Sequence, residues 1–369
     1  MRIIVVGAGA VGLAAAWRLA EAGHAVTVIE AGAIPNPTGA SWDEHRLCRL
    51  PYGDQDGYAQ LMTPAMAAWE RVWSALGERH YAETGCLALS TAEGDWTDRS
   101  RASLARLGLP HGVMTQTEVA ERCPFLRVDD ARFGLWTRGG VLFADRITAG
   151  FAALARSAGA RLLSETLASA VDPAGSRVLL ADGRALDGDA VLVAAGAWTS
   201  QLAPWVGDDL TPLRQVVVYA APPPALAEAW REAPILLDMG GPRGMYAAPP
   251  VAERRLKFGC GALNRPGDPD TPRTAGPQDG PPVLAAWRQR LVDYDAYRLL
   301  EARICVYAHA ADQRFRVARS GRAVAITGCS GHAFKFAALL GEGLAAALGG
   351  DEEPLRWIGG EAAAYARAD

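Results

Sequence analysis

Residues 2–30 constrain the fold more than any other part of this sequence. RIIVVGAGAVGLAAAWRLAEAGHAVTVIE begins with an apolar run over 2–6, passes through a glycine-rich turn into a helical pattern that ends near residue 22, and returns to an apolar run over 25–30. Two buried strands joined by a helix form a βαβ unit, which opens many parallel sheets. The segment therefore predicts an α/β fold in which helices cover a parallel sheet.

The turn of this unit carries the motif GxGxxG at Gly7, Gly9 and Gly12. Gly7 permits the tight turn, Gly9 lets the backbone approach a diphosphate, and the free N–H groups at the helix start attract that anion. Glu30 ends the second strand, where a carboxylate can accept hydrogen bonds from a ribose 2′-hydroxyl. The unit predicts a dinucleotide site. It leaves FAD and NAD open, because both contain ADP, and it disfavours NADP.

The composition narrows the class of protein. A chain of 369 residues is too long for one ordinary core, so two domains or one large α/β body are expected. The net charge of −4, without a basic stripe, argues against a nucleic-acid partner. Six cysteines are scattered without CxxC or metal-type spacing, which predicts reduced thiols, no metal site and a cytoplasmic location.

The uncharged run after Arg2 also resembles a signal peptide, but the strand, the glycines and the helix in register fit the nucleotide-binding unit better. No segment reaches the roughly 18 apolar residues of a membrane span. We therefore expect a soluble protein without a membrane partner, and a monomer.

Further elements follow along the chain. Helical periodicity is present in 58–79 and 146–158, strand-like runs in 84–90 and 160–167, and a hairpin pattern around 172–189. AVLVAAGAW, residues 190–198, reads as a buried strand that meets the cofactor at Gly196. RAVAITG, residues 322–328, is another buried strand, and a helix carrying Lys335 is expected after it.

These elements predict a Rossmann-like nucleotide-binding domain in separated pieces and a second, substrate-binding domain built on an antiparallel sheet, α+β overall. The stretch 264–282, rich in proline and glycine, is interpreted as at best a mobile surface loop. The predicted bounds are 1–84, 142–206 and 300–369 for the nucleotide domain, and 85–141 and 207–299 for the substrate domain.

Beyond these patterns, the chain resembles the monomeric sarcosine oxidase and N-methyltryptophan oxidase family, a branch of the D-amino-acid-oxidase fold. The resemblance covers nearly the whole chain in order. It is carried by the N-terminal unit and by HRLCRLPYG (45–53), AAGAW (194–198), PLRQVV (212–217), CVYAHAADQRF (305–315) and CSGHAFKF (329–336).

The resemblance implies that the cofactor is FAD, bound by the N-terminal glycines, Glu30, Gly196 and Gly331. In the family, the cysteine of the CxYxxxxDxxF segment is bonded through sulfur to the flavin 8α-methyl. Cys305 stands at that position, so a covalent flavin is expected. Judged from the sequence without the family, Cys305 would be read as a small buried hydrophobic residue.

The resemblance also implies a site for a substrate carboxylate. The family binds this group with the lysine of GHxFKF and the second arginine of xRxxR, here Lys335 and Arg49. A point charge and a planar fork donor suit a buried anion. Tyr307, two residues after Cys305, is expected beside the substrate. A lysine on an apolar helix otherwise usually turns its amine to water.

Arg46, Lys257, Tyr246 and His45 are expected to take part in catalysis, the first three by the same resemblance. Arg46 matches the arginine near the flavin ring, and Lys257 matches the lysine that activates dioxygen. Tyr246 matches a pocket tyrosine. Two positions depart from the family: a histidine is replaced by Gly261, and His45 stands where a small hydroxyl residue is usual, so sarcosine itself is doubtful as the substrate.

We therefore expect an FAD-dependent oxidase that converts a secondary amine or an imino or amino acid bearing a carboxylate into an imine, with reoxidation of the flavin by dioxygen to give hydrogen peroxide. Three alternatives stay open. They are a dehydrogenase that uses a quinone or carrier protein, a biosynthetic enzyme acting on a cyclic imino acid, and a non-catalytic flavoprotein. The four basic residues Arg46, Arg49, Lys257 and Lys335 weigh against the last.

Overall fold

The computed structural model describes residues 1–241 and 243–359, and its first sheet contains the N-terminal strand. The six strands of this sheet run in the order β20-β21-β13-β1-β2-β9, and all neighbours are parallel except β20 and β21. Their bounds are Arg316–Ser320 for β20, Ala323–Thr327 for β21, Ala190–Val193 for β13, Arg2–Val6 for β1, Ala25–Ile29 for β2 and Arg161–Leu163 for β9.

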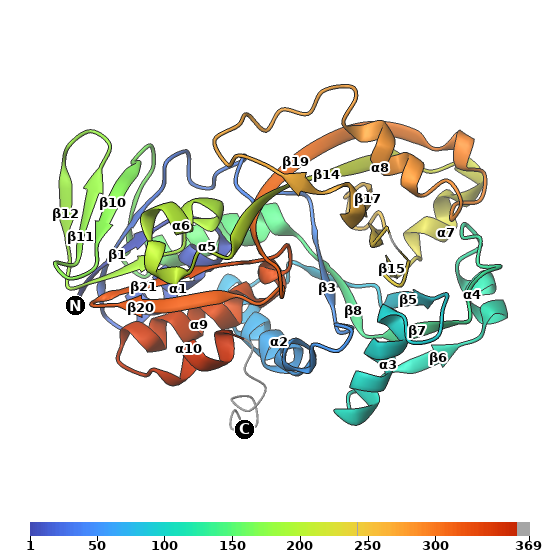
Figure 1. Ribbon diagram of the computed structural model, residues 1–369, viewed down its shortest axis with the longest axis horizontal. Helices are drawn as coiled ribbons and strands as arrows, with labels where there is room; N and C mark the ends of the chain where they lie inside the picture. Colours follow the sequence, from blue (N-terminus) through green and yellow to red (C-terminus); the bar gives the residue numbers. More distant parts are fainter. Residues whose placement is uncertain (242, 360–369) are drawn as a thin grey trace.

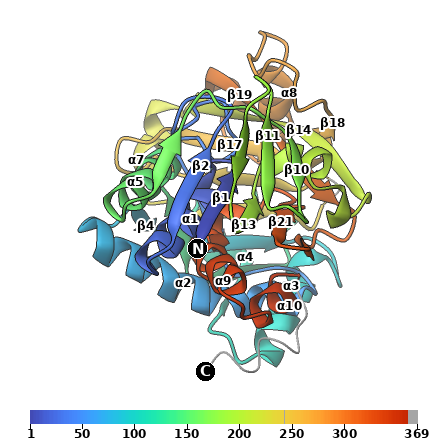
Figure 2. The same cartoon turned by 90° about the vertical axis from the view of Figure 1, so that its left-hand side faces the viewer.

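Both faces of this sheet are covered, which is why its central strands are almost entirely apolar. Helices α1 (Ala10–Glu21), α5 (Ala144–Ser157) and α9 (Ala337–Leu348) form one layer together with α2 (Asp56–Leu76), and α9, α2 and α10 (Glu353–Ile358) lie below the sheet in both ribbon views (Figures 1 and 2). A three-stranded sheet packs on the other face through Val178 and Leu180. It consists of β10 (Ala168–Asp172), β11 (Arg177–Leu180) and β12 (Ala185–Asp187).

A second large sheet forms the other half of the molecule (Figure 1). Its strand order is β18-β14-β17-β16-β15-β5-β7-β6, with β19 paired along β14, and its pairs are antiparallel except β5 with β15. This agrees with the antiparallel second sheet predicted from the sequence. The bounds are Arg265–Pro266 for β18, Leu210–Ala221 for β14, Leu256–Cys260 for β17, Met245–Ala248 for β16, Ile235–Asp238 for β15, Cys86–Ser90 for β5, Phe133–Thr137 for β7, Gly112–Met114 for β6 and Arg298–Ala310 for β19.

Short helices complete this half, and a small sheet links it to the first. The helices are α3 (Trp96–Arg106), α4 (Gln116–Arg122), α7 (Ala227–Arg231) and α8 (Gly280–Ala286). The small sheet has the order β3-β8-β4, with bounds Arg46–Arg49, Gly139–Leu142 and Tyr81–Glu83. Strand β3 thereby places Arg46 and Arg49 at the junction of the two halves (Figure 1).

Two local predictions differ from the structure. The run 160–167 forms only the three-residue strand β9. Lys335 lies in the 3-10 turn η6 (Ala333–Phe336), directly before α9, instead of on that helix. The glycine turn after β21 delays the helix, so Lys335 is held where the chain enters it.

The predicted boundary at residue 300 cuts through β19, which is hydrogen-bonded to β14 from Arg298 to Ala310 and so belongs to the second sheet. Leu300 itself lies at an irregularity of the register, but the pairing with β14 continues on both sides of it. The last predicted segment of the nucleotide domain also includes residues 360–369, which lie outside the described part of the chain.

Candidate active site

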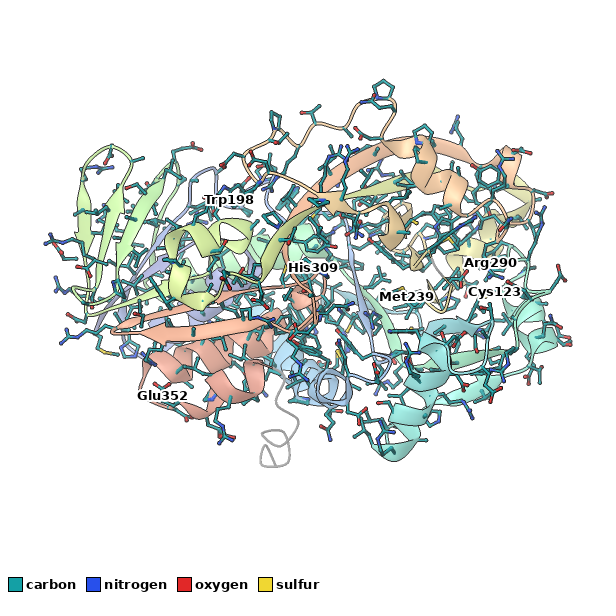
Figure 3. All side chains as sticks on the ribbon, viewed as in Figure 1. Cys123, Trp198, Met239, Arg290, His309 and Glu352 are labelled. Carbon is teal, nitrogen blue, oxygen red and sulfur yellow. The ribbon has the colours of Figure 1, made fainter. Side chains whose placement is uncertain are left out.

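A cavity of about 1120 Å³ lies where the two large sheets meet. Its walls come from the β1–α1 turn, the ends of β2, β13 and β21, and residues of β14, β16, β17 and β19. Trp198, His309 and Met239 are three of the lining residues and run along this junction (Figure 3). Pockets for drug-sized ligands measure roughly 300–1,000 Å³, so this cavity has room for a dinucleotide and a second small molecule.

The glycine motif forms the nucleotide end of the cavity. Gly7 has φ +105°, and a Cβ there would lie 2.5 Å from the carbonyl oxygen of Ala194. A Cβ on Gly12 would collide with the carbonyl oxygen of Gly7, so the turn packs tightly against the helix. Gly7 and Gly9 line the cavity and expose bare backbone at the N-terminus of α1. The predicted cradle for a diphosphate is therefore present, and it fits FAD.

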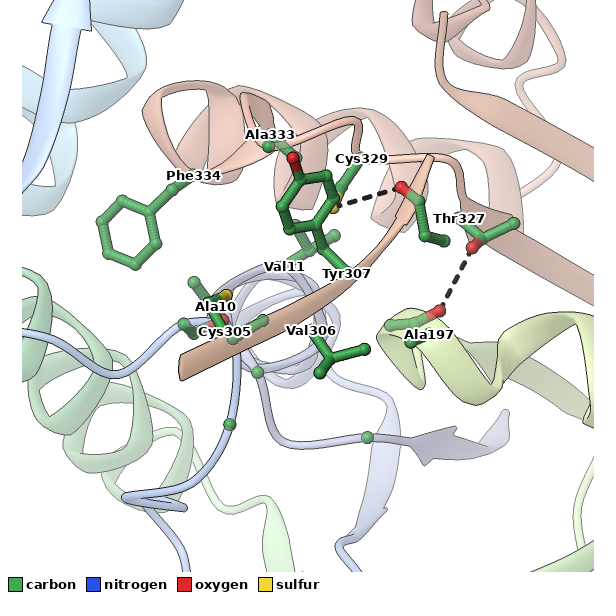
Figure 4. A pocket seen from close by; sticks show the side chains of 18 of the residues that line it. Ala10, Val11, Ala197, Cys305, Val306, Tyr307, Thr327, Cys329, Ala333 and Phe334 are labelled. Carbon is green, nitrogen blue, oxygen red and sulfur yellow. Dashed lines mark hydrogen bonds between the residues drawn. The ribbon is translucent and has the colours of Figure 1, made fainter. Parts of the chain in front are cut away.

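Glu30, Gly196 and Gly331, the other predicted cofactor contacts, also line the cavity. The Glu30 carboxylate accepts hydrogen bonds from the backbone N–H of Ala8 (2.9 Å) and from Asn36 Nδ2 (3.0 Å), which hold it at the end of β2. Gly196 has φ +58°, and its carbonyl oxygen accepts a hydrogen bond of 3.1 Å from Thr327 Oγ1 (Figure 4).

The segment 264–282, interpreted as at best a mobile surface loop, lies largely at the surface and also contacts distant parts of the chain. Trp198 Nε1 donates to Asp270 Oδ1 at 2.6 Å, and the guanidinium of Arg273 lies 4.9 Å from the Trp198 ring centroid and donates to the carbonyl oxygen of Thr38. Asn264 and Asp270 line the cavity. Long-range contacts of this kind leave no periodic pattern in the sequence.

Asp43 was not among the residues predicted from the sequence, yet its carboxylate binds three basic side chains, those of Lys257, Arg46 and Arg303. Its side chain is 4% exposed and lines the cavity. One carboxylate oxygen accepts hydrogen bonds from Lys257 Nζ and Arg46 Nη1, and the other from Tyr219 and from Arg303 Nη1 at 3.1 Å. The only sequence signal was an acid three residues before Arg46.

Burial and ion pairing oppose each other in this cluster. Burial alone raises the pKa of Asp43. The charges of Lys257 and Arg46 and the hydrogen bonds to the carboxylate together outweigh burial, so the pKa is well below its ordinary value. Burial lowers the pKa of Lys257 to about 8, and Asp43 limits the fall. The carboxylate is therefore ionised, and it keeps the lysine charged up to mildly alkaline pH.

Cys305, Tyr246, Tyr307 and Cys329 line the same cavity. Figure 4 shows Cys305, Tyr307 and Cys329 in its wall. Burial raises the pKa of Cys305, and Arg46 is the largest opposing influence. The hydroxyl of Tyr307 accepts a hydrogen bond of 3.1 Å from Asn264 Nδ2. The ring of Tyr246 lies on the backbone of Gly259, where a Cβ would collide with it.

Lys335 and Arg49 lie together in another part of the cavity wall. Lys335 is 4% exposed, and its amine donates to the carbonyl oxygen of His332 at 3.0 Å, so it points inward and not to water. Arg49 donates to the carbonyl oxygen of Pro51 and stacks at 4.3 Å from the Tyr52 ring centroid. Both basic side chains line the cavity, and no ion pair joins either of them to a carboxylate in the described part of the chain.

His45 is placed differently from the other predicted residues. It is fully buried outside the cavity lining, with Nε2 3.1 Å from the carbonyl oxygen of Arg255 and its ring stacked on Tyr219. Burial, followed by Lys257, lowers its pKa to about 3, so the imidazole is neutral. Its backbone does contribute, because the carbonyl oxygen accepts a 3.0 Å hydrogen bond from Lys257 Nζ. We assign no catalytic role to its side chain.

Residues 1–241 and 243–359 contain no group of three or more His, Cys, Asp or Glu side chains that could hold a metal ion. None of the helices in that described part has the length and apolarity to span a membrane. All six cysteines are unpaired thiols.

Comparison with known proteins agrees with this geometry. A family model described as FAD dependent oxidoreductase matches residues 2–347. The chain is 26% identical over 361 residues to an N-methyl-L-tryptophan oxidase of Yersinia pestis, covering 95% of each sequence.

Among solved structures, a Tyr258Phe mutant of NikD, described as an unusual amino acid oxidase essential for nikkomycin biosynthesis, superposes with a TM-score of 0.81 at 22% identity over 96% of each chain. An L-proline dehydrogenase from P. horikoshii gives 0.83 at 21% identity, covering 97% of this chain and 96% of the other. At these identities the structural matches establish the fold.

Proposed function

The chain belongs to the family of FAD dependent oxidoreductases, and from that premise we propose that it oxidises a carbon–nitrogen bond in an amino or imino acid that carries a carboxylate. Gly7, Gly9 and Glu30 would hold FAD, which would supply the acceptor for a hydride from the carbon next to nitrogen. Dioxygen is the proposed acceptor, and hydrogen peroxide and an imine are the proposed products.

The observation that carries the proposal is the distribution of charge in one cavity. Lys335, which is buried, and Arg49, which is half-buried, supply two basic side chains without an acidic partner in the described part of the chain, as a carboxylate ligand requires. Lys257 and Arg46 supply two further cations, held together by Asp43. Cations at that place favour negative charge that develops on the cofactor or on dioxygen during electron transfer.

A substrate screen tests the proposal. Secondary amino acids and cyclic imino acids are offered to the purified protein, and peroxide formation is measured under air. Peroxide with at least one carboxylate-bearing amine, and none with its decarboxylated analogue, is expected. If oxidation requires a quinone or another artificial acceptor, the electron acceptor is a carrier and not dioxygen, and the protein is a dehydrogenase. No oxidation of any amine under either condition would contradict the proposal.

A Gly9→Val variant is expected to lose nearly all bound flavin. A Cβ at Gly9 would already lie 3.1 Å from Ser41 Oγ, and the two methyl groups of valine fill the space where the backbone meets the diphosphate. Flavin content per purified protein is read from the absorption spectrum. Gly112→Val in the edge strand β6 is the control, because its Cβ meets no atom closer than 3.9 Å. Normal loading of Gly9→Val would place the diphosphate elsewhere.

Substitutions at Lys335 and Arg49 are expected to weaken carboxylate binding. Simple carboxylates with a thioether or an aromatic ring are titrated against the flavin spectrum. Lys335→Met is expected to cost about 1.5–3 kcal/mol, the scale of a hydrogen bond to a charged group. Arg49→Lys is also expected to weaken binding, because one ammonium cannot reproduce the planar fork. If Lys335→Met binds the carboxylates as tightly as the parent protein and the Arg49 variants bind them more weakly, Arg49 alone holds the anion.

We further propose that Cys305 carries the flavin covalently, and that the protein is a cytoplasmic monomer. The position of Cys305 in the cavity wall supports the covalent bond.

Six unpaired cysteines support a cytoplasmic location, because the cytoplasm is a reducing compartment. Size measurement by light scattering in solution tests the monomer.

A further inference from the structure

The chain uses lysine at only two positions. It has 37 basic residues, of which Lys257 and Lys335 are the lysines and the remainder are arginine. Both lysines are buried, at 2% and 4% exposure, and both line the same cavity. Arginine is always charged, whereas a buried lysine changes its protonation state readily. Among the lysine and arginine residues of this chain, these two positions are therefore the ones whose side chain can lose its proton.

The surroundings of the two lysines are opposite in character. Lys257 is paired with the ionised carboxylate of Asp43 and also donates to the carbonyl oxygen of His45. Within residues 1–241 and 243–359, the amine of Lys335 makes one hydrogen bond, to the carbonyl oxygen of His332. The titratable groups that influence or face it are Arg49 and Cys48 on β3, Tyr52 after that strand, and Cys329 and His332 before η6. None of these is a carboxylic acid, and the guanidinium of Arg49 is the one permanent charge among them.

Contacts with two aromatic rings favour a charged Lys335, but they are weaker than the opposing effects of burial and of Arg49. Its amine lies 5.5 Å from the ring centroid of Tyr52 and 5.6 Å from that of Phe336, within reach of a cation–π interaction. Arg49 already stacks on Tyr52 at 4.3 Å. An ammonium has three donors and finds one acceptor here, and burial beside a second cation disfavours it. Burial, followed by Arg49, lowers the pKa of Lys335 well below its ordinary value.

We propose that Lys335 is a neutral amine in the cavity without substrate, and that it takes the proton from the ammonium group of the arriving amino acid. An N–H bond of the substrate breaks, and an N–H bond forms at Nζ. The substrate then carries a neutral amine and a carboxylate, and that carboxylate pairs with the new ammonium and with Arg49. No electrons move in this step. The inference rests on the proposed function, because it requires a substrate with both groups.

One residue thereby performs two tasks that the reaction needs. Hydride loss next to nitrogen requires the nitrogen lone pair, which the ammonium form of an amino acid does not have. The proton leaves the substrate as the carboxylate gains its counter-ion. Lys257 cannot do this, because Asp43 already holds it as an ammonium.

The experiment uses the small number of lysines. Flavin-loaded protein is labelled with lysine carrying ¹³C at Cε and ¹⁵N at Nζ, which gives two side-chain signals, assigned with Lys257→Arg and Lys335→Arg variants. At neutral pH without ligand, the Lys335 signal is expected at the amine position and the Lys257 signal at the ammonium position. Saturation with (methylthio)acetate, which has a carboxylate and no amine, is expected to move Lys335 to the ammonium position. An ammonium signal for Lys335 before ligand is added overturns the proposal, as does an amine signal that persists after saturation.

Calorimetry provides the second measurement. Binding of (methylthio)acetate in buffers with different ionisation enthalpies is expected to take up about one proton per ligand in the parent protein. Lys335→Arg is expected to bind the ligand without proton uptake, because arginine is already charged. Equal uptake in both proteins contradicts the role of Lys335. Neither measurement depends on turnover. An absence of amine oxidation would therefore contradict the proposed function, while the protonation state of Lys335 would still be determined by these two measurements.

Discussion

A Cys305→Ser variant is expected to release all of its flavin when it is denatured in acid, whereas the parent protein keeps yellow, fluorescent flavin on the polypeptide. Cys305 lies on β19 and lines the cavity, with Arg46 as the cation that most favours its thiolate. Serine keeps the size of the side chain but lacks the nucleophilic sulfur. The folded variant is therefore expected to bind FAD reversibly through the N-terminal glycines.

Cys329 provides the matched control, because it is the other thiol shown in the cavity wall beside Tyr307 (Figure 4). Its Sγ is 3.8 Å from the carbonyl oxygen of Ala308. Cys329→Ser is expected to retain the attached flavin. Flavin that stays on the polypeptide in Cys305→Ser but is lost in Cys329→Ser would assign the bond to Cys329. Flavin that is soluble after denaturation of the parent protein would show that no covalent bond forms.

Lys257→Met is expected to slow reoxidation of the reduced flavin by dioxygen by about 10²–10³-fold, the scale for removing one preorganised group that stabilises developing charge. Its effect on reduction by substrate is expected to be far smaller, because Lys335 and Arg49 hold the substrate carboxylate in our proposal. The two half-reactions are measured separately in stopped flow. Reduction with dithionite lets the dioxygen half be measured without any substrate. Equal slowing of both halves would instead place Lys257 in the substrate site, and unchanged reoxidation would leave it without a role.

The same cluster predicts a pH dependence. The pKa of Lys257 is lowered to about 8 by burial, so its charge is present below that pH and is lost as the pH rises through it. The reoxidation rate is expected to fall over the same range. Asp43 raises the pKa of Lys257, so Asp43→Asn is expected to lower it further and to move the fall to lower pH. In a Lys257→Met background, Asp43→Asn is expected to have little further effect. A fall at the same pH in Asp43→Asn would mean that Asp43 does not act through Lys257.

Much of the fold was readable from the sequence because its signals are local. The apolar run of β1, the glycine turn and the apolar stripe of α1 lie within residues 2–21, and each has a steric or periodic cause that needs no distant partner. The same holds for the buried strands β13 and β21, whose uninterrupted apolar residues reflect cover on both faces. Family motifs then identified the cysteine, arginines and lysines that the structure brings to one cavity.

The tertiary structure decided which groups those side chains meet. Asp43 and Lys257 are 214 residues apart in sequence, and only the meeting of β17 with the segment before β3 brings them into contact. The segment 264–282 lacks any period, yet it makes hydrogen bonds with Trp198 and with the carbonyl oxygen of Thr38.

Lys335 was open to both an outward and an inward placement, because an apolar stretch accommodates either. The turn η6 and the packing of Phe336 and Tyr52 direct it inward. A sequence determines its local conformations through sterics and periodicity. The protonation state and partner of a buried charge depend on groups that only the assembled fold brings within a few ångströms.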